Sequence, residues 1–298
     1  MPISDTQLGF DHHLDFFRKL GSLTGDLERD AHCHRQAEYM HALSICDAIR
    51  DIHFDAATLS HSVKNPEANF HMRFGIARRA KFIWLSIRGV LGLVMPDRTE
   101  PLPHDEVEEI TRDLNVIYIN IRGTLDNLAW LLLDLFASDK TRNLPPVKIS
   151  LFGNEYLKDG NLADIAKFIK PYEDWNGELS GKRDPAAHRI PLSVIPAIID
   201  SETKDEYQRT MEEYNNMIGD AFRDSANWEI AEPKFEKAHA LHEKLESIGK
   251  FAPLFVHHPD EGAMKIYPTV PQNIGQLVRI TRGIFEITRV RLSNMKLA

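Results

Sequence analysis

The segment 182–189 carries the residue types in this sequence that are best suited to chemistry. It contains Arg183 and His188, and between them Asp184 and Pro185 are a favoured pair for starting a helical turn. Such a turn would bring His188 back toward Arg183. A histidine can take a proton from a hydroxyl group near neutral pH, while a guanidinium neutralises charge that develops on a phosphate. The segment predicts phosphodiester cleavage with His188 as general base or acid, Arg183 as phosphate clamp, and no metal ion or other cofactor.

The residues around this pair have supporting roles in the same prediction. Asp184 would orient Arg183 or cap the turn, and Lys182 and Arg189 would steer a nucleic-acid backbone. The alternative is a polar turn in which Arg183 pairs with an acidic helix and His188 packs beneath a neighbouring loop. Similar spacing recurs in three further arginine–histidine pairs: Arg29 and His34, Arg35 and His41, and Arg98 and His104.

A histidine-rich helix predicted at 26–63 offers a different chemistry. His34, Glu38 and His41 lie close to one face of that helix. Glu38 and His41 form an E-x-x-H pair of the kind that carboxylate-bridged di-iron bundles use. The two histidines are about 10 Å apart along the helix axis, so other helices would have to supply the remaining ligands of a metal site. A half-exposed helix face is the other interpretation of these residues.

Charge is spread unevenly along the chain. The net charge is -8, which argues against a protein that coats nucleic acid, yet residues 68–96 contain no carboxylate. That stretch holds five cations: Arg73, Arg78, Arg79, Lys81 and Arg88. The last predicted helix adds Arg279, Arg282, Arg289 and Arg291. These cations could face phosphates, or they could pair with the acidic helices around 105–113 and 200–246, and the paired or solvated interpretation is the more common one for charged faces.

Apolar residues at steps of three and four predict the elements that position these side chains. The longest helices are expected at 26–63, 69–95 and 103–137, with further helices at 5–20, 162–170, 173–178, 202–222, 232–248 and 271–292. Glycine and prolines between 181 and 196 argue against a long helix there. Extended segments are expected at 148–152, 192–199, 251–257 and 263–267. The fold class is therefore mainly α, a multi-helix bundle with a minor β ribbon or hairpin.

A polar stripe follows one side of the helix predicted at 103–137. Asp113, Asn120, Asn127 and Asp134 recur every seven residues and so lie near one line on the helix surface. The stripe is either solvated or hydrogen-bonded to a neighbouring helix. Of the two, we expect the solvated arrangement.

Length and composition limit the classes of protein. The chain has 298 residues, of which 43% are hydrophobic and 27% charged, as in an ordinary globular protein. We expect one domain over 1–298, or else a helical core at 1–180 and a ribbon with C-terminal helices at 181–298. The apolar runs are too short to span a bilayer and the first residues lack a secretory signal, which predicts a cytoplasmic protein. Cys33 and Cys46 would lie roughly 20 Å apart on one helix, too far for a disulfide.

Arg183, Asp184 and His188 match the R-x4-6-H signature, in which an arginine and a polar residue precede a histidine. The segment therefore resembles HEPN domains, helical-bundle proteins that are often metal-independent ribonucleases in toxin–antitoxin and phage-defence systems. Residues 121–136 also resemble a core helix of such proteins. The resemblance is confined mainly to 121–136 and 182–191.

The resemblance implies a homodimer in which two motifs meet across the two-fold axis. It also implies RNA as the substrate, attack by the 2′-hydroxyl, a cyclic phosphate product, and an antitoxin or another protein partner. Two alternatives remain beside this ribonuclease or RNA-binding protein. One is a metal-binding bundle centred on His34, Glu38 and His41, and the other is a non-catalytic interaction protein that uses its apolar and basic helix faces.

Overall fold

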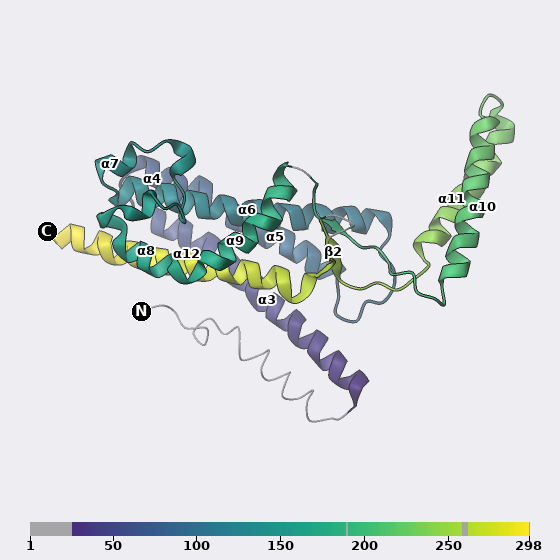
Figure 1. Ribbon diagram of the computed structural model, residues 1–298, viewed down its shortest axis with the longest axis horizontal. Coiled ribbons are helices and arrows are strands. Elements are labelled where there is room, and N and C mark those ends of the chain that lie inside the picture. Colours follow the sequence, from purple (N-terminus) through teal and green to yellow (C-terminus); the bar gives the residue numbers. More distant parts are fainter. Residues whose placement is uncertain (1–25, 189, 258–261, 298) are drawn as a thin grey trace.

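The computed structural model describes residues 26–188, 190–257 and 262–297, so the helix predicted at 5–20 lies outside the described residues. Long helices run side by side through most of the described chain, and a small antiparallel sheet lies near one end of them (Figure 1). The prediction of a mainly α bundle with a minor β element is confirmed.

Four helices form the body of the bundle: α3 (Leu27–Ser60), α5 (Arg78–Leu93), α6 (His104–Phe136) and α12 (Ile266–Leu297). Helix α6 packs against α5, α5 against α3, and α3 against α12. The apolar stripe of α6 is fully buried at Ile110, Leu114, Ile117, Ile121 and Leu128. Burial of such a stripe removes apolar area from water, which is the main force that holds the helices together.

The helix that precedes α6 in the chain changes its hydrogen-bonding pattern midway. It begins as α4 (Pro66–Phe70), continues through a π-helical segment, η1 (His71–Ala77), and proceeds into α5. Asn65 caps its N-terminus by accepting a hydrogen bond from the backbone of Ala68 at 2.9 Å. The helix predicted at 69–95 is therefore confirmed, with a π-helical segment that the apolar pattern did not predict.

Short elements connect α6 to the rest of the bundle. They are α7 (Asp139–Arg142), η2 (Pro146–Lys148), η3 (Tyr156–Lys158), η4 (Gly160–Leu162), α8 (Ala163–Ile169) and η5 (Lys170–Tyr172). The strand predicted at 148–152 is wrong, because the backbone turns there through hydrogen bonds from Ile149 to Pro146 and from Gly153 to Ser150. The alternating burial of Ile149 and Leu151 produced a strand-like pattern in a segment that is a pair of turns.

Helix α9 (Glu173–His188) is longer than predicted. It continues through Gly181 and Pro185, so the expectation that these residues end it near 178 is wrong. Its first half is fixed by tertiary contacts: Trp175 donates to Asn273 at 2.9 Å, and Leu179 is fully buried. Packing of this kind routinely overrides the low helix propensity of single residues.

The small sheet has the order β1-β2-β3 and joins distant parts of the chain. Strand β1 (Ser193–Val194) pairs with β2 (Leu254–Val256), which pairs with β3 (Met264–Lys265), both pairs being antiparallel. These strands confirm the extended segments predicted at 192–199, 251–257 and 263–267. Val194 and Phe255 are buried, so the sheet closes one end of the core.

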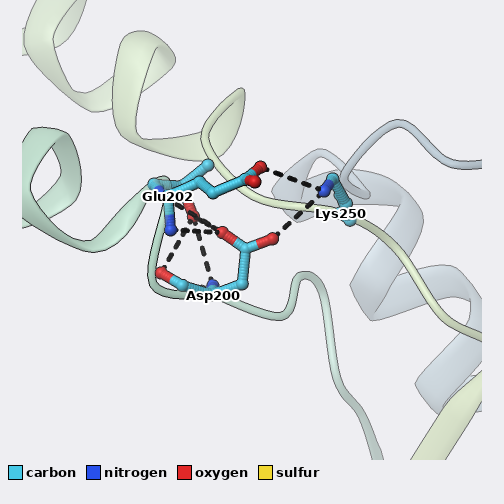
Figure 2. Close-up of polar contacts among 4 residues, drawn as sticks. Asp200, Glu202 and Lys250 are labelled. Carbon is cyan, nitrogen blue, oxygen red and sulfur yellow. Dashed lines mark hydrogen bonds and ion pairs between the residues drawn. The ribbon is translucent and has the colours of Figure 1, made fainter.

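Helices α10 (Lys204–Arg223) and α11 (Trp228–Glu246) form a helical hairpin that projects from the bundle (Figure 1). The two chain segments at its base are joined by backbone hydrogen bonds between Ile198 and Lys250 of 2.8 and 3.1 Å. Figure 2 shows that Lys250 also contacts the carboxylates of Asp200 and Glu202, at 3.1 and 3.7 Å. This cluster, Asp200, Glu202, Thr203 and Lys250, is called the hairpin clamp below.

No helix among the described residues combines the length and apolar character that crossing a bilayer requires.

Candidate functional site

The predicted cleavage residues lie at the C-terminal end of α9. Arg183 and Asp184 are inside the helix and His188 is its last residue. The helix begins at Glu173 and not at Pro185, so the predicted cap by Asp184 is wrong. The side chains of 182–188, and residue 189 altogether, lie outside the described part of the structure. The roles predicted for Lys182, Arg183, His188 and Arg189, and the orientation of Arg183 by Asp184, therefore stay predictions.

The histidines and the glutamate of the predicted metal stripe are on α3, as expected, but they do not converge. His34 is exposed whereas His41 is buried, and Glu38 is half-buried between them. Across the described residues, no three His, Cys, Asp or Glu side chains are grouped so that they could hold a metal ion. Among these residues the solvated or packed helix face is therefore the interpretation that the structure favours.

The two cysteines are both free. Burial raises the pKa of the Cys46 thiol to about 11, so this side chain stays protonated near neutral pH. Cys46 is therefore a packing residue of α3.

The arginine of the pair Arg98 and His104 has structural partners. Its guanidinium donates to the backbone carbonyl of Leu93 at 3.0 Å and forms an ion pair with Glu106. It also lies 5.9 Å from the centre of the Phe251 ring. Arg98 therefore fixes the chain between α5 and α6 and does not contribute to a site.

The polar stripe of α6 packs against η1 and α5, so the expectation that it is solvated is wrong. Asp113 and Asn120 are each only 8% exposed. Asp113 accepts a hydrogen bond from Ser86 at 3.2 Å, and Asn120 accepts one from Arg79 at 3.1 Å. Further along the same line, Asn127 and Asp134 both face His71. Its Nδ1 lies 3.1 Å from the Asn127 amide oxygen, and its Nε2 lies 3.9 Å from Asp134.

We call the contacts of Asp113, Asn120, Asn127 and Asp134 with Ser86, Arg79 and His71 the polar seam. Three glycines let the helices approach closely enough to form it. A Cβ atom at Gly75 would lie 2.0 Å from the side-chain oxygen of Asn127, and one at Gly89 would lie 2.3 Å from Asp113. On α6 itself, a Cβ at Gly123 would lie 2.4 Å from the guanidinium of Arg79. The seam is therefore built from polar side chains that fill the spaces left by glycines on the facing helix.

Outside the seam, the same helix presents rings and cations to solvent. We call this surface the aromatic–basic face; its exposed residues are Phe70, Arg73, Phe74, Arg78, Lys81, Phe82 and Arg88. Phe70, Phe74 and Phe82 are 58%, 46% and 45% exposed, which is unusual for large apolar side chains that recur along one helix.

The cations of this face have no acidic partners. No described carboxylate forms an ion pair with Arg73, Arg78, Arg79, Lys81 or Arg88. The predicted pairing with the acidic helices around 105–113 and 200–246 is therefore wrong for them. By contrast, cations of the last helix are paired: Arg282 with Asp51, Arg289 with Glu286, and Arg291 with Asp164. Of these two basic stretches, the one between residues 68 and 96 is thus the one whose cations have no carboxylate partner among the described residues.

The rings and cations of the face contact one another. The guanidinium groups of Arg73 and Arg78 lie 5.8 and 5.1 Å from the centre of the Phe74 ring, and that of Arg88 lies 5.4 Å from the centre of Trp84. Such cation–π contacts hold the arginines flat on the surface without neutralising them.

A cavity of about 330 Å³ opens between the face and the seam. It is lined by Phe70, His71, Phe74, Gly75, Arg78, Arg79, Phe82, Asn120 and Asn127. The cations were noted from the sequence, but the rings were not, although Phe70, Phe74, Arg78 and Phe82 recur at steps of four. That repeat, in a stretch from 68 to 96 that is free of carboxylates, is the signal that could have found the site.

Comparison with models of protein families, with curated proteins and with solved structures gave no match. The proposed function therefore rests on the residues of this chain.

Proposed function

We propose that this protein binds single-stranded RNA on the aromatic–basic face and cleaves it without a metal ion, with His188 as general base or acid and Arg183 as phosphate clamp. The observation that carries the proposal is the cluster of five cations between residues 68 and 96 without acidic partners in the described structure. The cleavage step is supported by the residue types at the end of α9 and by their resemblance to the HEPN signature.

The face has the two components that binding of a single strand requires. Exposed rings such as Phe74 and Phe82 can stack on unpaired bases, which adds about 1 to 3 kcal/mol per base. Arginines beside them, such as Arg73 and Arg78, can contact the phosphates and release counterions. Since the net charge of the whole chain is -8, a polyanion is attracted to this face and repelled elsewhere.

The HEPN resemblance extends the proposal to the assembly. It implies a homodimer in which two copies of the Arg183–His188 pair meet, and an antitoxin or another protein that controls the activity. In such a dimer, RNA held on the aromatic–basic face would be cut by attack of its own 2′-hydroxyl, leaving a cyclic phosphate.

The binding step is tested with a fluorescently labelled 20-nucleotide RNA without base pairing. We expect the double variant Arg73→Ala/Arg78→Ala to bind at least about tenfold more weakly than wild type. The slope of log affinity against log salt should become shallower by about 0.7 for each phosphate that the variant no longer neutralises. The double variant Lys204→Ala/Arg209→Ala, which removes the same charge from the exposed surface of α10, is the matched control and should bind nearly as wild type does.

Equal loss of affinity in the two double variants would contradict the face as the binding surface, as would wild-type protein that does not bind.

Phe74→Ala should weaken binding while Phe74→Trp keeps it, because a tryptophan ring also stacks on bases. A duplex RNA should bind more weakly than the single strand, since its bases are not free to stack.

The cleavage step is tested with a mixed RNA pool in EDTA, with product ends analysed for cyclic phosphate. We expect wild-type protein to cut, and His188→Ala to cut at least about a hundredfold more slowly, because a general acid or base contributes about 10² to 10⁴ to a rate. His104→Ala is the control: it removes an exposed histidine that follows an arginine, Arg98, at a similar spacing in the sequence. Equal cutting by His188→Ala, or no cutting by wild type, would contradict the nuclease.

A further inference from the structure

The cavity at the aromatic–basic face contains a cation whose charge no side chain neutralises. Arg79 is half-buried and donates one hydrogen bond from Nη1 to the amide oxygen of Asn120. Its guanidinium packs directly on the backbone of α6 at Gly123, and no described carboxylate forms an ion pair with it. A guanidinium has five N–H donors, so most of those of Arg79 are available to an anion that enters the cavity.

The other polar groups of the cavity are arranged so that their acceptor atoms are already used. The Nδ2 atoms of Asn120 and Asn127 donate to backbone carbonyls of α6, at 2.8 and 2.6 Å. Their amide oxygens therefore face the seam, where Asn120 accepts from Arg79 and Asn127 accepts from Nδ1–H of His71. With these oxygens engaged, the cavity offers donors and positive charge, a match for an anion and not for a metal ion.

One carboxylate, Asp134, lies near His71, but it is on the Nε2 side of the ring, 3.9 Å away. Trp130 stacks on the same ring at 5.7 Å between centres, so His71 is held in place.

The cavity is closed on one side and lined by exposed rings on the other. On one side η1 and α6 are in contact, with Gly75 against Asn127 and Gly123 against Arg79, so the cavity is closed there. On the other side stand Phe70, Phe74 and Phe82, which are exposed and can stack on a base. A phosphate that binds Arg79 therefore lies against the closed side, with its nucleoside toward the rings.

We propose that the cavity lined by His71, Arg79, Asn120 and Asn127 binds the terminal phosphate monoester of an RNA strand. A terminal monoester carries up to two negative charges, and an internal diester carries one, so the unneutralised guanidinium of Arg79 favours the end. This inference rests on the proposed RNA-binding function and specifies which part of the strand the face recognises.

The test compares three labelled 12-nucleotide strands of one sequence, with a 5′-phosphate, a 3′-phosphate or hydroxyls at both ends. The strands are 2′-O-methylated so that they cannot be cleaved by attack of a 2′-hydroxyl. We expect one phosphorylated strand to bind the full-length protein at least about tenfold more tightly than the hydroxyl strand, as hydrogen bonds to charged groups allow. Which of the two binds more tightly identifies the end that the cavity takes.

Variants assign the preference to the cavity. Arg79→Gln should abolish the preference for the phosphorylated strand while the hydroxyl strand keeps most of its affinity, and Arg79→Lys should retain part of the preference because it keeps the charge without the planar fork. Arg209→Gln, which removes the same charge from the exposed surface of α10 and lies outside both the cavity and the aromatic–basic face, should leave the preference intact. Circular dichroism and melting temperature are recorded for each variant, and Arg79→Lys keeps the test valid if Arg79→Gln does not fold.

The two proposals fail in different ways. Equal binding of all three strands by wild-type protein, or a preference that survives in Arg79→Gln, would overturn the terminal-phosphate site and leave the RNA-binding face in place. Absence of binding to every strand would overturn the RNA-binding face, and this inference with it.

Discussion

Asp134, at the end of the polar seam, is a partly buried carboxylate whose burial costs free energy of folding. Its side chain is 20% exposed, and its buried Oδ2 accepts no hydrogen bond within the described structure. Burial raises the pKa of Asp134, and the nearby His71 only partly offsets this effect. The charged form is therefore less stable in the folded protein than in the unfolded chain.

The pH dependence of this residue follows from the direction of its shift. Because the pKa of Asp134 is higher in the folded state, the folded protein binds the proton more tightly, and the unfavourable contribution disappears as the pH falls through that raised pKa. We expect Asp134→Asn to raise the free energy of unfolding at pH 7 by on the order of 0.5 kcal/mol and to change it little near pH 3. Urea unfolding at the two pH values measures both.

Asp47→Asn is the matched control for this prediction, because Asp47 is an exposed carboxylate on α3. It should not raise stability at pH 7. If Asp134→Asn instead lowers stability at neutral pH, the attraction between Asp134 and His71 outweighs the burial, contrary to the prediction.

Among the helices, the π-helical segment η1 determines which residues of its helix reach the seam. The wider turn of a π-helix brings His71, Gly75 and Arg79, each four residues apart, onto one line. Without the extra residue in this turn, an α-helical repeat continued from His71 would place Arg78 there and turn Arg79 away. The ring of His53 on α3 donates to the backbone carbonyl of Ala77 at 2.9 Å, which satisfies the carbonyl where η1 ends.

The close approach at Gly75 can be tested against another glycine of the same helix. Gly75→Ala places a Cβ atom 2.0 Å from the side-chain oxygen of Asn127, and we expect it to reduce the free energy of unfolding by about 1 to 3 kcal/mol. Gly92→Ala has no heavy atom within 4 Å of the added Cβ and should increase stability by about 0.5 to 1 kcal/mol, because alanine favours helix. Denaturant unfolding of the two variants gives opposite signs, and equal effects would contradict the role of Gly75 in the seam.

The helices whose apolar residues follow one steady period could be predicted from the sequence. Apolar spacing located α3 and α6 to within a few residues, and turn residues located the small sheet. The π-helical segment and the last turns of α9 depend on contacts with other helices, which a single-helix pattern does not contain. For the same reason, the seven-residue repeat from Asp113 to Asp134 could be recognised in the sequence, but its packing against η1 and α5 could not.

Part of the candidate site could likewise be predicted from the sequence, and part could not. The excess of cations between 68 and 96 is a property of the sequence, whereas their lack of carboxylate partners is a property of how α10 and α11 project away from the bundle. The prediction at Arg183 and His188 came from residue types and spacing alone. The cavity came from glycines on two different helices, and no local spacing on one helix reveals such a pair.

For the whole molecule, the hairpin clamp connects two parts that pack mostly within themselves. Asp200 accepts hydrogen bonds from Lys250 and from the backbone and hydroxyl of Thr203. The hydrogen bond from Lys250, followed by those from Thr203, lowers the pKa of Asp200 to about 2. This stabilisation is present above the ordinary pKa of an aspartate and is lost as the pH falls toward 2.

Removing the cation should loosen the hairpin without loosening the bundle. We expect Lys250→Met to move the pKa of Asp200 from about 2 toward its ordinary value, as followed by carboxyl NMR titration. Amide hydrogen exchange should accelerate at residues 202–246 and remain unchanged in α6, because local opening needs less free energy than global unfolding. Lys204→Met removes a nearby exposed cation as a control, and equal effects of the two variants would contradict the clamp.

The projecting hairpin also gives the protein an electric dipole. Residues 204–246 carry eleven carboxylates and six cations, whereas residues 68–96 carry five cations and no carboxylate. Figure 1 shows α5, which carries four of these five cations, within the bundle and away from the projecting helices α10 and α11. An approaching polyanion therefore exerts a torque that turns the hairpin away from it. At 0.1 M salt, where the screening length is about 10 Å, this orientation acts only in the last stage of the encounter.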